Sequence, residues 1–283
     1  MKCMEMLDDI AAYDISILQT GYSNFRNLNS AMHLPADEEL SELTQTSIED
    51  LEQYDNWYFI DGDCWYYKEV YRAFVLVNEL LGEKLSLYMD LPTIRYSLVS
   101  KEGKLSGLIS KNFKNQSENY AKGISIPPEL IGYLQKCLID RNKSISEHTR
   151  RQLTSYLIRN FYSALCDRIA NTLYAYNSKE PFIMAPLWDY ESSFCDSTLR
   201  DYVDPLIYFP FSYHNCELLA NNNDYFKYYL HKIWTFDIKR ALQEIAFEHK
   251  IVIPSEFYKY YRQFDIERKE VLNEMGLKKE LSR

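Results

Sequence analysis

Asp189 is an acidic residue in an apolar setting. It lies in the stretch APLWDYESS, from Ala185 to Ser193, where leucine and tryptophan precede it and tyrosine follows it. A buried carboxylate needs a hydrogen bond, a cation or a metal ion to compensate for the water that it has lost. We therefore expect Asp189 either to bind a metal ion at a phosphate site or to cap a turn with Ser192 and Ser193.

Four polar residues upstream of Asp189 are of types that occur in catalytic sites. Lys68 lies in an aromatic run typical of a strand. Glu79 lies off the apolar stripe of the helix expected next, which suits a residue that faces a cleft and equally one on a solvated face. Asp167 and Asn171 are four positions apart, so both could also decorate one side of an exposed helix.

The first part of the chain predicts a hairpin, a helix and a second hairpin. Asp61–Gly62 separates two runs rich in aromatic residues, which is a strong hairpin signal. Apolar residues then recur at helical spacing over 77–88, and Pro92 marks the end of that helix. Two further strands are expected on either side of Glu102–Gly103. This order indicates an antiparallel sheet with a helix packed on it.

The second part of the chain is mostly helical. Helices are expected over 127–142, over 151–176 and from residue 224 to the end, and the run 181–188 interrupts them with extended, apolar character. The sequence therefore predicts an α+β fold with two lobes.

The β-rich N-terminal lobe would span 1–115, with a variable segment at 1–43, and the mostly helical C-terminal lobe would span 116–283. Ligands commonly bind in the cleft between two such lobes.

The order of these polar residues resembles the protein-kinase-like fold, most closely the HipA-like kinases and their phosphatidylinositol-kinase-like relatives. In that family a strand lysine, a helix glutamate, a DRHxxN catalytic loop and a later metal-binding aspartate assemble around ATP. The resemblance runs from about Trp57 to Phe194 and includes the phrase GLISKNF at 107–113. The corresponding residues are Lys68, Glu79, the run CDRIAN from Cys166 to Asn171, and Asp189.

The resemblance implies an ATP-dependent phosphotransferase, most closely a protein serine/threonine kinase. Lys68 would contact the phosphates of ATP, and Glu79 would hold the lysine in place. Asn171 and Asp189 would bind Mg²⁺ through oxygen atoms. Asp167 would orient the hydroxyl group of the substrate and accept its proton.

The sequence departs from the family pattern at two places. Ile169 stands at the histidine of the catalytic loop, and Asp167–Asn171 is one position shorter than the family spacing. Either the loop is shorter by one residue, or Cys166 takes the aligned position, which would remove the catalytic aspartate. The expected phosphate-binding turn before the lysine strand contains no glycine, so that Thr46 and Ser47 would be its donors. These departures leave open a catalytically inactive pseudokinase that acts as a protein-binding module. A kinase-fold enzyme that acts on a small molecule, or that transfers another group, is a further alternative.

Composition narrows the choice of partners and compartment. The net charge of −9 disfavours a broad nucleic-acid-binding face, so we expect a protein substrate or a regulatory protein partner and no nucleic acid. The six cysteines form no CxxC pair, which argues against zinc and against a disulfide framework. The acidic start of the chain is unlike a signal peptide, and no apolar run is long enough for a membrane span. We therefore expect a cytoplasmic protein that does not enter a membrane.

Overall fold

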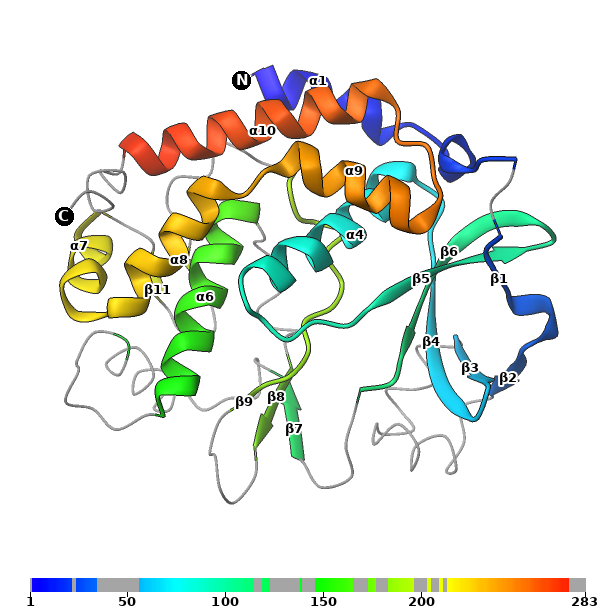
Figure 1. Cartoon of the computed structure of the whole chain (residues 1–283), viewed down its shortest axis with the longest axis horizontal. Coiled ribbons are helices and arrows are strands. Elements are labelled where there is room, and N and C mark those ends of the chain that lie inside the picture. Colours follow the sequence, from blue (N-terminus) through cyan, green and yellow to red (C-terminus); the bar gives the residue numbers. More distant parts are fainter. Residues whose placement is uncertain are drawn as a thin grey trace.

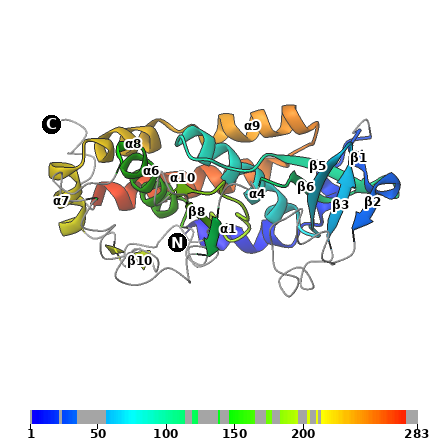
Figure 2. The ribbon, with the colours of Figure 1, turned by 90° about the horizontal axis from the view of Figure 1, so that it is seen from below.

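A six-stranded sheet lies at one end of the molecule and helices α6–α8 lie at the other, with helix α4 between them (Figure 1). Turning the view by 90° gives the same arrangement (Figure 2). The computed structural model describes residues 2–21, 24–34, 56–113, 119–122, 138, 146–164, 173–176, 183–195, 203–204, 209–210 and 213–274.

The sheet has the strand order β1-β5-β6-β4-β3-β2. Its neighbouring strands are antiparallel except for β1 and β5, which are parallel. The strands are β1 (Arg26–Asn27), β2 (Met32–Leu34), β3 (Trp57–Ile60), β4 (Asp63–Glu69), β5 (Tyr96–Lys101) and β6 (Lys104–Lys111).

Both predicted hairpins are confirmed. Asp61–Gly62 joins β3 to β4, and Glu102–Gly103 joins β5 to β6. All four turn residues have positive φ angles, between 52° and 84°. Positive φ at both central positions is the type I′ geometry, whose twist matches that of the strands it connects. The two tight turns fix the register of the strands that carry the site.

The register places Lys68 and Tyr96 on the same face of the sheet. Lys68 pairs with Leu108 on β6, and Tyr96 of β5 pairs with Ser110, two positions further along β6. Because side chains alternate along a strand and cross-strand partners share a face, both side chains project to one side. Tyr67 projects to the opposite side, where it is buried in a second, smaller core.

Helix α4 (Ala73–Tyr88) is the predicted helix that follows the first hairpin. It is buried along most of its length because it lies between the sheet and the other helices. A helix in such a position is expected to be apolar on nearly all sides. Its buried polar residues Asn78, Glu79 and Glu83 are therefore exceptions for which a partner is needed.

The described residues form six other long helices. They are α1 (Lys2–Ala11), α6 (Glu147–Ser163), α7 (Tyr213–Asn222), α8 (Asp224–Thr235), α9 (Ile238–His249) and α10 (Ser255–Glu274). Two short 3₁₀ turns lie at Ile15–Leu18 and Leu28–Ser30. The expected helical character after residue 224 is confirmed over 224–274. The helix expected at 127–142 lies almost wholly outside the described residues, and the lobe boundary at 115/116 stays a prediction.

The helix predicted over 151–176 is wrong in its second half. Helix α6 ends at Ser163, where Ala164 adopts a left-handed conformation, and Leu173–Tyr176 forms strand β8. Strand β8 pairs with β7 (Asn119–Lys122) and β9 (Ile183–Met184), so backbone pairing overrides the helical spacing. A further short pair is formed by β10 (Val203–Asp204) and β11 (Phe209–Pro210).

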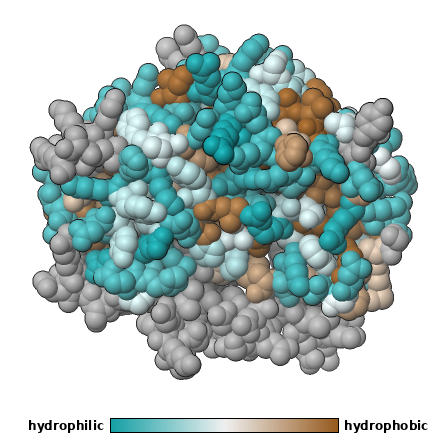
Figure 3. Space-filling model, viewed as in Figure 1, coloured by the Kyte–Doolittle hydropathy of each residue, from teal (hydrophilic) through white to brown (hydrophobic). Residues whose placement is uncertain are grey.

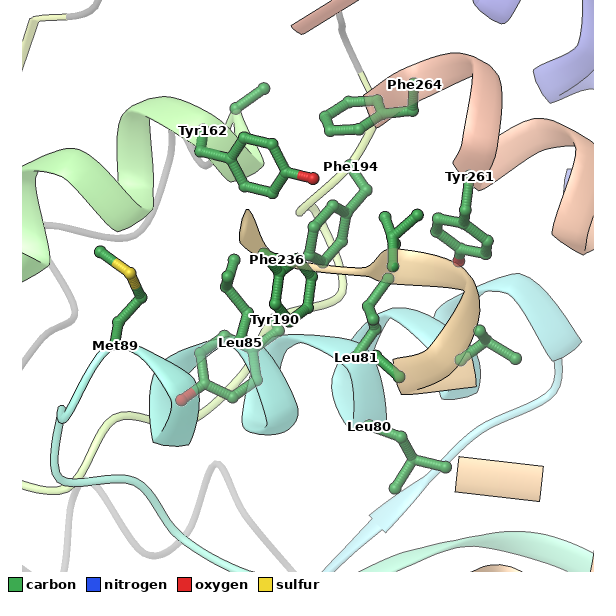
Figure 4. Close-up of a cluster of buried hydrophobic side chains, with 14 of the residues drawn as sticks. Leu80, Leu81, Leu85, Met89, Tyr162, Tyr190, Phe194, Phe236, Tyr261 and Phe264 are labelled. Carbon is green, nitrogen blue, oxygen red and sulfur yellow. The ribbon is translucent and has the colours of Figure 1, made fainter. Parts of the chain in front are cut away.

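Aromatic side chains fill the main core between α4, α6 and α10. Phe194 lies between Tyr261 and Phe264 of α10, in edge-to-face geometry with both (Figure 4). Helix α1 lies alongside α10, where Tyr13, which follows α1, stacks on Phe257. Such contacts add to the hydrophobic stabilisation of the core. They place the stretch around residue 190 against two helices.

The surface shows no broad apolar face in the view of Figure 3, where hydrophilic residues predominate and apolar ones form separate small groups. Among the helices that the structure describes, none is both long enough and apolar enough to cross a membrane.

Gly82 allows the ring of Tyr190 to lie directly against α4. A Cβ atom at Gly82 would be 2.3 Å from Cγ of Tyr190, far inside van der Waals contact. We expect Gly82→Ala to destabilise the protein by about 1–3 kcal/mol, because an added methyl group must displace a buried ring. Urea denaturation measures this change.

Gly21→Ala is the matched control, since Gly21 has no atom within 4 Å of the added Cβ. Stabilisation by Gly82→Ala, as in an open helix, would contradict the close contact.

His249, at the end of α9, is a half-buried titratable group. Burial lowers the pKa of its imidazole from 6.5 to about 4, and the nearby cations Lys84 and Arg95 act in the same direction against Glu248. Between about pH 4 and pH 6.5, His249 therefore binds a proton in the unfolded chain but not in the folded chain. The resulting stability is complete above about pH 6.5 and is lost as the pH falls towards 4.

We expect the free energy of unfolding to fall by about 1–2 kcal/mol between pH 7 and pH 5 because of this one group. In urea titrations at the two pH values, His249→Gln should reduce the difference. His231→Gln, which alters an exposed histidine of α8, should leave it unchanged. An unaltered pH dependence in His249→Gln would contradict the assignment.

Candidate functional site

The ammonium group of Lys68 lies among three carboxylates. Its Nζ atom is 2.6 Å from Oε1 of Glu79 and 2.9 Å from Oε2 of Glu191, and it contacts Oδ1 of Asp189. The lysine comes from β4, Glu79 from α4, and the two other acids from a segment more than a hundred positions away in the sequence. The site thus joins three separate parts of the fold.

Glu79 is completely buried, so the alternative of a solvated helix residue is excluded. One carboxylate oxygen, Oε1, accepts a hydrogen bond from Lys68. The other, Oε2, accepts bonds of 2.8 Å from the hydroxyl of Tyr96 and from the backbone amide of Tyr190. These bonds compensate the buried charge. Glu79 therefore holds both the lysine and the backbone next to Asp189.

A short parallel pairing leads the chain to Asp189. The amide of Leu187 donates to the carbonyl of Pro92 at 2.8 Å, and the amide of Ile94 donates to the carbonyl of Leu187 at 3.0 Å. At Asp189 the backbone turns through the left-handed region, with φ of 62°. Aspartate is among the few residues that tolerate this conformation. The turn leaves the carboxylate beside Lys68.

Tyr190 anchors the same turn from the buried side. Its hydroxyl is 2.6 Å from that of Thr93 and 3.3 Å from that of Ser86, and its ring covers the guanidinium of Arg159 at 4.5 Å. Burial raises the pKa of Tyr190 to about 12, which keeps its hydroxyl protonated. The residue after the candidate metal ligand is thus fixed in the core.

Helices α4 and α10 hold the segment beyond Tyr190. The amide group of Asn78 donates to the carbonyl of Glu191 at 2.8 Å, and the hydroxyl of Tyr261 donates to Asn78 at 2.6 Å. Further along, the hydroxyl of Tyr260 donates to the carbonyl of Phe194 at 2.5 Å. The segment is therefore positioned by buried polar contacts as well as by apolar packing.

Among the described residues, three carboxylates and one ammonium group meet at the site. Carboxylate oxygens of Glu79, Asp189 and Glu191 lie within 4.8 Å of one another, and Lys68 supplies one positive charge. Exposure increases across the group, from 0% for the side chain of Glu79 to 21% for Asp189 and 41% for Glu191. Three carboxylates with one ammonium favour a further cation, and oxygen donors of this kind suit Mg²⁺.

Three of the predicted site residues are brought together, namely Lys68, Glu79 and Asp189. The other candidates, Asp167, Asn171, Thr46 and Ser47, lie outside the described residues. Helix α6 ends before Asp167 and strand β8 begins after Asn171, so the helix predicted over 151–176 is not continuous.

The sequence interpretation missed Glu191 and Tyr96. Glu191 stands two positions after Asp189 in a stretch that drew attention only to the aspartate, so its signal was the second acid itself. Tyr96 gave no signal of its own, because the chain contains 25 tyrosines. Its role follows from the strand register, which places it on the face that carries Lys68.

Removal of the ammonium group of Lys68 should destabilise the fold. We expect Lys68→Met to lower the free energy of unfolding by about 2–3 kcal/mol, because three carboxylates then repel one another in a partly buried site. Lys111→Met is the control, since Lys111 forms an exposed pair with Asp63 at 2.8 Å on the same sheet and should change stability by less than about 1 kcal/mol. Equal losses in the two variants, measured by urea denaturation, would count against the central role of Lys68.

Comparison with known proteins gives matches in structure. No protein-family model matches the sequence, and no curated protein matches it. The Helicobacter pylori proinflammatory kinase CtkA superposes with a TM-score of 0.52 at 14% identity, over 80% of this chain and 90% of that chain. Toxin–antitoxin system protein HipA of Shewanella oneidensis MR-1, solved with HipB and operator DNA, superposes with a TM-score of 0.50 at 10% identity, over 93% of this chain and 75% of that chain.

At these identities the likeness concerns the fold, and it confirms the resemblance that the sequence indicated. The chain has the α+β protein-kinase-like fold in the form found in CtkA and HipA.

Proposed function

We propose that the protein is an ATP-dependent phosphotransferase, most closely a HipA-like protein serine/threonine kinase. The observation that carries the proposal is the position of Lys68, which contacts Glu79 on a helix and Asp189 on a distant segment. In phosphoryl transfer the protein mainly positions groups and stabilises charge. A lysine oriented by a buried glutamate, with an aspartate beside it, suits that task.

In this proposal Lys68 binds the phosphates of ATP. Its ammonium has three hydrogens, and each of three carboxylates now accepts from it or lies within ion-pair distance. Glu79 is held by two further donors, so it stays in place when the lysine exchanges another partner for a phosphate oxygen. The exposed Glu191 is the partner that exchanges most readily.

The donor set also suits Mg²⁺. Asp189 and Glu191 offer carboxylate oxygens that are more exposed than those of Glu79, and Asn171 would add an amide oxygen. A bound Mg²⁺ would neutralise negative charge on the phosphates. The chain's own contribution is to fix the direction of Asp189 through the left-handed turn and the anchored Tyr190.

The rest of the proposal rests on the sequence. Asp167 would accept the proton of the substrate hydroxyl, and Thr46 and Ser47 would donate hydrogen bonds to phosphate. The substrate or regulatory partner would be a protein rather than a nucleic acid, and the protein would act in the cytoplasm.

A second candidate function is a catalytically inactive kinase fold that binds a protein partner. It is favoured by the saturation of Lys68, whose ammonium hydrogens are matched by three carboxylate partners. If these ion pairs are permanent, the lysine has no donor left for phosphate. Nucleotide binding therefore separates the two functions.

Magnesium-dependent ATP binding should raise the temperature of unfolding. With ligand at a hundred times its dissociation constant the stabilisation is about 2.7 kcal/mol, which is several degrees for a protein of this size. We expect Asp189→Ala to abolish the shift, because it removes the proposed metal ligand. Asp63→Ala should retain it, since Asp63 is an exposed acid of the same sheet, paired with Lys111.

Two results would contradict the kinase proposal. The first is a wild-type protein that shows no shift with any nucleotide and Mg²⁺, which would favour the protein-binding module. The second is an undiminished shift in Asp189→Ala, which would place the nucleotide elsewhere.

A further inference from the structure

Tyr96 connects Glu79 on helix α4 to the backbone at Asp189. Its hydroxyl donates a 2.8 Å hydrogen bond to Oε2 of Glu79 and accepts a 3.1 Å bond from the backbone amide of Asp189. The next amide, that of Tyr190, donates to the same oxygen of Glu79 at 2.8 Å. A closed set of hydrogen bonds thus links the helix glutamate, the tyrosine hydroxyl and two successive backbone amides.

We propose that Tyr96 is a positioning residue for nucleotide binding, whose hydroxyl couples the Lys68–Glu79 pair to the backbone at Asp189. This inference rests on the proposed function, because the ligand whose site is being positioned is ATP with Mg²⁺. Through this link, a movement of the helix glutamate shifts the aspartate, and a movement of the aspartate shifts the glutamate.

The chemistry of a phenol suits this position. The hydroxyl group can donate one hydrogen bond and accept another at the same time, whereas the neighbouring groups can do only one of the two. Tyr96 is buried, with 8% of its surface exposed, so water does not readily take over either bond. Burial and the negative charge of Glu79 raise the pKa of Tyr96 well above its usual value, so the hydroxyl keeps the proton that it donates.

The backbone at Asp189 requires such a contact. Its φ of 62° lies in the left-handed region, which is less stable for residues other than glycine and persists where the surroundings hold it. The two bonds to the amides of Asp189 and Tyr190 hold the segment on both sides of the turn. Without the hydroxyl of Tyr96, the amide of Asp189 loses its partner in this set.

Tyr96 is itself fixed in two ways. Its backbone amide donates a 2.9 Å bond to Oε2 of Glu83, which lies one helical turn after Glu79 on α4. Its place in β5, opposite Ser110 of β6, sets the direction of the side chain. The tyrosine therefore contacts two carboxylates of the same helix through its two ends, and its position is set before any ligand binds.

The test compares two tyrosines of neighbouring parts of the sheet. Tyr96→Phe removes the linking hydroxyl. Tyr67→Phe is the matched control, because Tyr67 is buried on the opposite face and its hydroxyl donates a 3.0 Å bond to the carbonyl of Ser106. Each variant loses one tyrosine hydroxyl, which makes two hydrogen bonds at Tyr96 and one at Tyr67, so a general effect of removing a buried hydroxyl would appear in both.

Two quantities are measured on the full chain. Calorimetric titration gives the affinity for ATP with Mg²⁺, and hydrogen exchange without nucleotide gives the protection of the amides of Asp189 and Tyr190. We expect Tyr96→Phe to weaken the affinity at least ten-fold and to accelerate exchange at these amides by a similar factor. Tyr67→Phe should remain within about two-fold of wild type in both quantities, in accord with its place outside the hydrogen-bonded set.

Each other outcome has a distinct meaning. A Tyr96→Phe variant that binds ATP as wild type does, or a Tyr67→Phe variant that is equally impaired, would overturn the inference and leave the proposed function intact. A wild-type protein without affinity for ATP would overturn the proposed function. Hydrogen exchange would then still test the coupling between Glu79 and the backbone at Asp189. Unchanged protection of the amides of Asp189 and Tyr190 in Tyr96→Phe would refute that coupling.

Discussion

One ammonium group surrounded by three carboxylates is the interaction on which the site depends. Lys68 brings together Glu79, Asp189 and Glu191, which would otherwise repel one another at these separations. Because the four residues come from a strand, a helix and a distant segment, their convergence requires the whole fold. The carboxylates of Asp189 and Glu191 form the more exposed side of the group, which is where the proposed function requires a cation to bind.

The surroundings of the ion pairs are arranged to keep them in one geometry. Glu79 uses its second oxygen to hold Tyr96 and the backbone of Tyr190, so the same carboxylate orients the lysine and the aspartate segment. Gly82 lets the ring of Tyr190 pack against the helix, and α10 supports the segment from behind through Tyr260 and Tyr261. The aromatic richness of the chain thus serves the site as well as the core.

Much of the fold and three of the site residues could be predicted from local patterns in the sequence. The other features depend on residues that are neighbours only in space. The Asp61–Gly62 and Glu102–Gly103 turns are strong local signals, and Lys68, Glu79 and Asp189 were found through their order along the chain. The helix expected to continue to residue 176 was wrong because pairing between strands decides the structure of 173–176. The contacts of Tyr96 and Glu191 could not be predicted, since they depend on strand register and on the direction of a single turn. The roles of Asp167, Asn171, Thr46 and Ser47 remain predictions.

The most direct measurement is a crystal structure with Mn²⁺ and a non-hydrolysable ATP analogue, with the metal located by its anomalous scattering. We expect a metal ion coordinated by Asp189, and a phosphate oxygen on Lys68 in place of one of its present carboxylate partners. A structure in which Lys68 keeps all three carboxylates, while metal and nucleotide are absent or bind at another surface, would contradict this expectation.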